Sequence, residues 1–182
     1  MLKLYHTGFS EIKAPDIHYG RKNADFGQGF YTSADIEFSK KWAKSRKDEV
    51  TVLNCYELKE DGLKIKRLTR DREWFSYIYG NRRLRDDPYK DYDVIIGPIA
   101  NDTIYDTLGI TTSGYLSEEE AMKILMLGPC YEQIVLKTEN AARALIFLSS
   151  EIIPIERITE YRKEVKKEEQ AFQEEMAKVL EG

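Results

Sequence analysis

The residues best suited to chemistry lie far apart in the chain. They are His6 near the start, the aromatic residues Tyr31 and Trp42 eleven positions apart, and the adjacent Glu132 and Gln133. An imidazole can donate or accept hydrogen bonds, and two aromatic rings so placed could face one another across a slot. Each residue also has an ordinary alternative as a core or solvated strand residue. The combination, rather than any one member, indicates a site.

Around Tyr31, two glycines bracket a polar residue and an aromatic pair enters a short strand, in the stretch Asp25-Phe26-Gly27-Gln28-Gly29-Phe30-Tyr31-Thr32-Ser33. Gly27 and Gly29 can adopt backbone angles with φ above zero and let another group approach the main chain. The stretch therefore suits either a ligand-binding loop or a tight turn into a buried strand. Both interpretations stay open from the sequence.

The composition is that of one globular domain. The chain has 182 residues and a net charge of −4, and this charge disfavours a nucleic-acid scaffold partner bound by phosphate neutralisation. Arginines cluster between positions 67 and 85, where a solvated helix surface is the simpler expectation. Cys55 and Cys130 are too few for a disulfide framework, and we expect neither a secretory leader nor a membrane span. We therefore expect a cytoplasmic protein without membrane partners.

Hydrophobic periodicity and turn residues predict the elements that must position these side chains. Strands are expected over residues 2–6, 29–32, 50–58, 63–68, 92–98 and 131–137, with edge or terminal strands at 146–148 and 152–155. Helices are expected over 34–47 with Ser33 as cap, 71–83, 102–108, from 117 onward, 138–145 and 158–182. The runs 50–58 and 63–68 flank Asp61-Gly62 and suggest an antiparallel pair.

This mixed order favours an α+β fold with split antiparallel and mixed sheets and flanking helices. We expect one domain over residues 1–157, followed by an amphipathic helix over 158–182 that packs on the domain or on a partner. There is no Walker A motif, no complete dinucleotide fingerprint and no hydrolase nucleophile elbow. With two histidines and two cysteines, no metal centre is expected.

The chain resembles the ADP-ribosyltransferase superfamily of the His-Tyr-Glu type, which includes diphtheria-like toxins and the poly-ADP-ribose polymerases. The resemblance rests on Tyr5-His6-Thr7-Gly8 and on Gly29-Phe30-Tyr31-Thr32-Ser33 with Trp42. A narrower resemblance is to a family of small bacterial proteins often grouped with this superfamily. It rests on Asp25-Phe-Gly-x-Gly-Phe-Tyr-Thr, Trp74 to Arg82, Ile96-Gly-Pro-Ile-Ala-Asn-Asp-Thr and Gln133 through Thr138 to Leu145. That narrower similarity covers most of residues 1 to 148.

The resemblance implies an ADP-ribosyltransferase-like fold, NAD as substrate and transfer of ADP-ribose to an acceptor. Tyr31 and Trp42 would hold the nicotinamide ring. His6 would bind the ribose, the backbone at Thr7 the carboxamide, and Arg21 the pyrophosphate. Gly29, Ser33 and Asn101 complete the implied NAD-binding set. A toxin of a toxin–antitoxin pair, with an antitoxin protein as partner, or an effector is the implied role.

The catalytic acid stays open among Glu132, Gln133 and Asp102. Side chains alternate along a strand, so Glu132 and Gln133 cannot both face one cleft. If Gln133 takes the acid's place, a neutral amide could position a substrate but would stabilise positive charge poorly. A catalytically inactive module that binds NAD or ADP-ribose, or that binds a protein partner, is the alternative. Thr7, where the superfamily usually has glycine, is a second departure.

Overall fold

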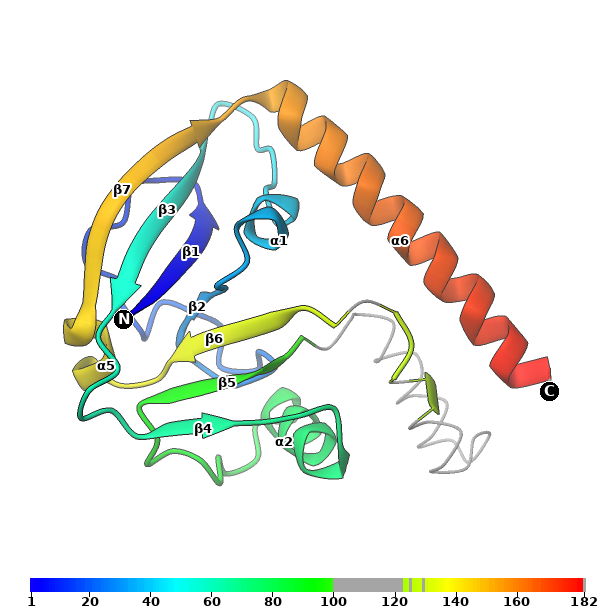
Figure 1. Ribbon diagram of the computed structural model, residues 1–182, viewed down its shortest axis with the longest axis horizontal. Coiled ribbons are helices and arrows are strands. Elements are labelled where there is room, and N and C mark those ends of the chain that lie inside the picture. The colour runs from blue at the N-terminus through cyan, green and yellow to red at the C-terminus, as the bar shows by residue number, and fades with distance from the viewer. Residues whose placement is uncertain (100–122, 125, 129, 182) are drawn as a thin grey trace.

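Two small β-sheets with helices beside them make up the computed structural model, which describes residues 1–99, 123–124, 126–128 and 130–181 (Figure 1). The three-stranded sheet has the order β1 (Leu2–Gly8), β3 (Thr51–Leu58), β7 (Leu145–Ile153) and is antiparallel. The four-stranded sheet has the order β2 (Phe30–Thr32), β6 (Glu132–Leu136), β5 (Val94–Pro98), β4 (Ile65–Arg67). The expected mixture of α and β structure with split sheets is therefore confirmed at this level.

The described helices are α1 (Ile36–Lys41), α2 (Arg72–Arg82), α5 (Glu139–Ala144) and α6 (Ile155–Glu181). Side-chain oxygens of Asp35, Asp71 and Thr138 accept hydrogen bonds from backbone N–H groups in the first turns of α1, α2 and α5. These caps satisfy N–H groups that lack an intrahelical partner. None of the described helices has the length and apolar character needed to cross a bilayer.

The central strands β5 and β6 of the four-stranded sheet are largely buried on both faces because their side chains alternate between two cores. Ile134 and Leu136 of β6 pack with Leu4 and Tyr56 between the two sheets. Val135 turns the other way and packs with α2. A third cluster joins the three-stranded sheet to α6, through Leu53, Ile153, Ile158 and Tyr161. This last cluster attaches the start of the long C-terminal helix to the rest of the molecule.

The antiparallel pairing expected between residues 50–58 and 63–68 is wrong. Strand β3 pairs with β1 and β7, whereas β4 pairs in parallel with β5 in the other sheet. Gly62 has a φ of +80°, so a turn does occur there. The turn leads the chain from one sheet to the other. Strand β4 has only three residues, and so short an alternation of apolar and polar side chains does not indicate which strand it pairs with.

The first helix also differs from its expected form. Helix α1 covers six residues, Ile36–Lys41, and its N-cap is Asp35. Ser33 instead forms a bridge with Tyr5, and its hydroxyl donates to the carbonyl of Glu132 at 2.8 Å. The strand-like conformation therefore continues past Thr32, which delays the helix.

Three smaller differences follow. Strand β1 extends to Gly8, so His6 lies inside the strand rather than at its end. The two short strands expected after residue 145 are one nine-residue strand, β7, and the C-terminal helix begins at Ile155. The helix expected over 102–108 and the start of the one expected from 117 lie outside the described residues.

Candidate functional site

A small cavity of about 150 Å³ lies beside the bridge that joins β1 to the end of β2, next to α1 and the start of β6. The backbones of Tyr5 and Ser33 exchange hydrogen bonds of 2.8 and 3.0 Å at this point. Six residues expected at a binding site line the cavity, namely His6, Thr7, Tyr31, Ser33, Trp42 and Gln133. They come from β1, β2, α1 and β6, so the fold brings together groups that are up to about 130 positions apart in the chain.

His6 is held in one orientation by its neighbours. Its Nδ1 lies 2.7 Å from the carbonyl oxygen of Tyr31, and its ring centroid is 4.5 Å from that of Phe30. A carbonyl only accepts, so Nδ1 carries the proton. Burial lowers the pKa of His6, which keeps the imidazole neutral at pH 7. In this tautomer Nε2 is a hydrogen-bond acceptor.

Tyr31 uses its hydroxyl inside the protein. The hydroxyl accepts from the backbone N–H of Phe26 at 2.9 Å and donates to the carbonyl of Gly27 at 2.7 Å. Burial raises the pKa of Tyr31, so the phenol stays neutral. The ring and backbone of Tyr31 can therefore contact a ligand in the cavity. Its hydroxyl is not available, because it is hydrogen-bonded to the backbone of the loop that precedes β2.

The loop before β2, which contains Asp25, is fixed to α2 by polar contacts. Arg82 Nε lies 2.6 Å from the carboxylate of Asp25, and Asn81 donates to the carbonyl of Asp25 at 3.0 Å. Gly29 is buried, and a Cβ at that position would lie only 2.6 Å from the carbonyl oxygen of Leu136. Position 29 requires a glycine because β6 approaches its backbone closely, and no ligand is needed to account for it. The structure therefore supports the tight-turn interpretation of the motif.

Gln133, not Glu132, faces the cavity. Strand β6 places Gln133 opposite Gly97 on β5, and its side chain is buried with 4% exposure. Within the described part of the chain its amide nitrogen Nε2 has no hydrogen-bond partner. A buried donor without an acceptor is costly, about 1–3 kcal/mol, so this group is suited to bind an oxygen of a ligand or a water. Glu132 is exposed at the start of the strand.

The aromatic side of the cavity is formed by α1. Phe38 is buried and stacks on Tyr131 at 4.4 Å between centroids, with Trp42 packed edge-on against Phe38 at 5.7 Å. Trp42 is 53% exposed. The hydroxyl of Thr7 donates to the carbonyl of Ser39 at 2.6 Å and so fastens β1 to α1. Trp42 thus lies at the mouth of the cavity, with one part of its ring system available to a ligand.

The remaining expected residues are not gathered here. Arg21 is exposed in the loop before β2, Gly29 packs on β6, and Glu132 points away. Asn101 and Asp102 lie outside the described residues. The described lining contains no Asp, Glu, Lys or Arg, and no described group of three or more His, Cys, Asp or Glu is arranged to hold a metal ion. The cavity is a neutral, hydrogen-bonding site.

Five lining residues were not expected: Tyr5, Thr32, Phe38, Ser39 and Ile99. For Phe38 the sequence did contain an indication, because it lies four positions before Trp42 and shares its helix face. Ser39 and Ile99 line the cavity because of where α1 and the end of β5 lie in the fold, which no local pattern encodes.

The sequence of the chain matches one protein family. A search of proteins with curated descriptions finds no match to the chain. One family model, described as a protein of unknown function (DUF3990), matches residues 2–147. The match spans β1 to the first part of β7 and includes every residue of the cavity, while α6 lies beyond it. The chain therefore belongs to the DUF3990 family.

Proposed function

We propose that the cavity binds the nicotinamide end of NAD and that the chain is an ADP-ribosyltransferase-like protein with the corresponding fold. The observation that carries this proposal is the convergence of His6, Tyr31, Trp42 and Gln133 on one cavity, with the Gln133 amide left unpartnered among the described residues. A cavity of about 150 Å³ is smaller than the ~300–1,000 Å³ of sites for drug-sized ligands. It suits one aromatic ring and its substituent rather than a whole dinucleotide.

The cavity offers distinct groups to such a ligand. His6 Nε2 accepts a hydrogen bond, as from a ribose hydroxyl, while Gln133 Nε2 donates one, as to a carboxamide or ribose oxygen. The half-exposed Trp42 supplies an aromatic face for the cationic ring, a contact worth about 0.5–2 kcal/mol. These groups would orient the bond between the ring nitrogen and ribose C1′.

Transfer would break that bond, and nicotinamide would leave with the electron pair. A nucleophile of the acceptor would then form a bond to C1′ and lose its proton. Positive charge develops on the ribose in between, and preorganised dipoles or charges must stabilise it. The Gln133 side chain supplies a dipole only, so we expect slow transfer.

A second candidate function is binding without transfer. It is favoured by one observation, the absence of a carboxylate from the described lining of the cavity. A module of this kind would retain affinity for NAD through the same hydrogen bonds and aromatic contact. The two candidates differ in turnover, not in binding.

The test is calorimetric titration with NAD, together with an assay of nicotinamide release, on the wild type and two variants. Gln133→Ala is expected to weaken NAD binding about tenfold, the equivalent of one buried hydrogen bond. Glu132→Gln, a change on the exposed neighbour, serves as the matched control and is expected to leave binding unchanged. Nicotinamide release by the wild type supports the transferase, and tight binding without release supports the binding module. Absence of NAD binding would eliminate both.

A further inference from the structure

A second, larger depression adjoins the cavity. It has a volume of about 530 Å³ and lies between α1, the start of β6 and α6, and we call it the α1–α6 groove. Phe38, Trp42 and Ile99 line both the groove and the cavity. The two spaces are therefore neighbours that share one aromatic wall. The volume of the groove falls in the range typical of small-molecule sites.

Helix α6 forms the outer wall with one regular face. The groove-lining residues of α6 recur at helical spacing, namely Arg162, Val165, Lys166, Glu168, Glu169 and Phe172. Figure 1 shows α6 running past α1 and the start of β6, and the cluster of Ile158 and Tyr161 fixes its first turns. Because the family match ends at residue 147, this wall is supplied by a helix outside the matched region.

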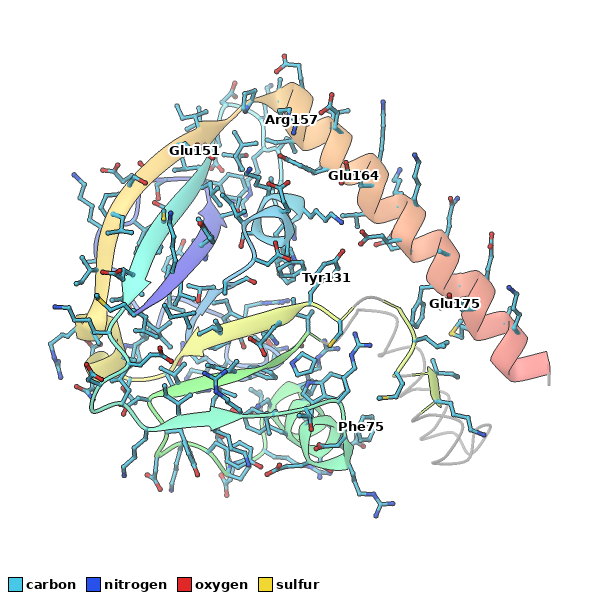
Figure 2. All side chains as sticks on the ribbon, viewed as in Figure 1. Phe75, Tyr131, Glu151, Arg157, Glu164 and Glu175 are labelled. Carbon is cyan, nitrogen blue, oxygen red and sulfur yellow. The ribbon has the colours of Figure 1, made fainter. Side chains whose placement is uncertain are left out.

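The middle of α6 is clamped to the site by a three-residue contact. Lys41 of α1 pairs with the carboxylate of Glu168, and the hydroxyl of Tyr131 lies 3.0 Å from both Lys41 Nζ and Glu168 Oε1. Tyr131 extends from the start of β6 towards α6 (Figure 2). Farther along, Phe172 is buried against Gly128. The groove face of α6 is therefore held in place before any ligand arrives.

The charge of the groove is opposite to that of the whole chain. Lys41 and Glu168 neutralise each other in the clamp. Of the other charged residues in the described lining, four are basic and one, Glu169, is acidic, although the net charge of the chain is −4. Arg162 and Lys166 are exposed and one helical turn apart, so both can approach the same anion.

We propose that the α1–α6 groove binds a nucleoside diphosphate, with Arg162 and Lys166 on its phosphates and Trp42 against its base. A guanidinium and an ammonium on one helix face suit phosphate oxygens. A half-exposed indole beside them suits a flat heterocycle, because every base has a π-face. The combination distinguishes a nucleotide from a simple inorganic anion, which would use the cations alone.

The test is titration of the full chain with ADP, which lacks the nicotinamide ring. The double variant Arg162→Glu/Lys166→Glu is compared with Lys163→Glu/Lys167→Glu, which makes the same kind of charge reversal at the same spacing away from the groove lining. We expect the first variant to weaken ADP binding about tenfold or more, and the second to leave it within about twofold. All four substituted positions are exposed, and a thermal melt checks that both variants fold.

Equal ADP affinities of the two variants, or no binding of ADP to the wild type, would overturn the inference. Trp42→Ala provides a second arm and is expected to weaken ADP binding without affecting inorganic pyrophosphate. If the loss were the same for both ligands, the base would not be at Trp42, and the nucleotide assignment would be wrong.

The source of the diphosphate is then distinguished by competition. If saturating NAD abolishes ADP binding and Arg162→Glu/Lys166→Glu also weakens NAD binding, the groove holds the diphosphate half of the same dinucleotide. Trp42 then contacts the base, and His6 and Gln133 hold the nicotinamide end without it. If ADP binds equally well in the presence of NAD, the groove holds a separate nucleotide substrate. Because ADP binding is measured without nicotinamide, it can succeed while the proposed function fails. Conversely, sensitivity of NAD binding to Gln133→Ala can persist when the groove variants have no effect.

Discussion

At the scale of single residues, His6 shows how burial sets the chemistry of the cavity. Its ring packs on Phe30, and its Nδ1–H is committed to the carbonyl of Tyr31. Desolvation lowers the pKa of the imidazole more than the backbone hydrogen bond raises it. The folded protein therefore favours neutral His6 with Nε2 as an acceptor, and protonation would replace that acceptor with a donor.

This shift predicts a pH dependence of stability. Between the lowered pKa of folded His6 and the unfolded value near 6.5, the unfolded chain binds a proton that the folded chain does not. The free energy of unfolding should therefore decrease as the pH falls through this window. Urea unfolding between about pH 5 and about pH 8 would measure the slope.

The variant His6→Gln is expected to flatten that slope, since it removes the shifted group. His18→Gln is the matched control, because it removes the other histidine from an exposed loop. An unchanged slope in His6→Gln would show that other groups dominate the pH dependence.

At the scale of elements, the loop before β2 shows that a motif can be structural although it resembles a ligand loop. Gly27 has a φ of +72°, and a Cβ there would lie 2.8 Å from Lys137 Nζ. Lys137 is paired with Asp87 at 3.2 Å and donates to the carbonyl of Phe26. Position 27 therefore requires a glycine for two reasons: the backbone has a positive φ, and a side chain would collide with Lys137 in the buried polar contacts next to the loop.

We expect Gly27→Ala to lower the free energy of unfolding by more than Gly62→Ala. Both glycines have positive φ, which costs other residues roughly 1–2 kcal/mol. At Gly62 nothing lies within 4 Å of the added Cβ, so this backbone strain is the only cost of the substitution. At Gly27 the Lys137 contacts are also disturbed, which adds about 1–3 kcal/mol. Chemical denaturation of both variants gives the difference, and equal losses would show that Lys137 moves aside freely.

The elements also show where sequence patterns succeed. The helical spacing of Trp74 and Ile78 identified α2, because it places both side chains on one apolar face of a helix. The apolar run after Asp93 identified β5 because an interior strand is buried on both faces. The length of α1 was overestimated because basic residues, which favour the C-terminal end of a helix, continue to Lys47, whereas α1 ends at Lys41 with Trp42 as its C-cap. Basic residues of this kind are compatible with a helix but do not determine where it ends.

For the cavity, residue types and spacing identified His6, Tyr31, Trp42 and Gln133, and the family resemblance added Thr7 and Ser33. The side of β6 that faces it could not be predicted, because a one-residue shift in register exchanges Glu132 and Gln133. The groove was missed for a different reason. It depends on where α6 packs, and contacts such as Lys41 with Glu168 join residues 127 positions apart.

At the scale of the whole molecule, α6 is both a wall of the groove and a part of the fold. Ile158 and Tyr161 are 2% and 5% exposed and complete the cluster with Leu53 and Ile153. Burying a large apolar side chain contributes about 1.5–3 kcal/mol. Two such residues represent a large share of the roughly 5–15 kcal/mol by which domains are stable. The helix therefore cannot be regarded as a detachable tail.

Two truncations separate these roles. A chain ending at residue 169 keeps Ile158, Tyr161 and the Lys41–Glu168 clamp and loses Phe172, so it is expected to unfold cooperatively with a loss of about 2–3 kcal/mol. A chain ending at residue 157 loses all three buried side chains and the clamp, and its unfolding free energy should fall by about twice as much or more. Urea unfolding of both chains measures this order. Equal stabilities would show that the first turns of α6 contribute little, and that the three-stranded sheet and α1 hold together without them.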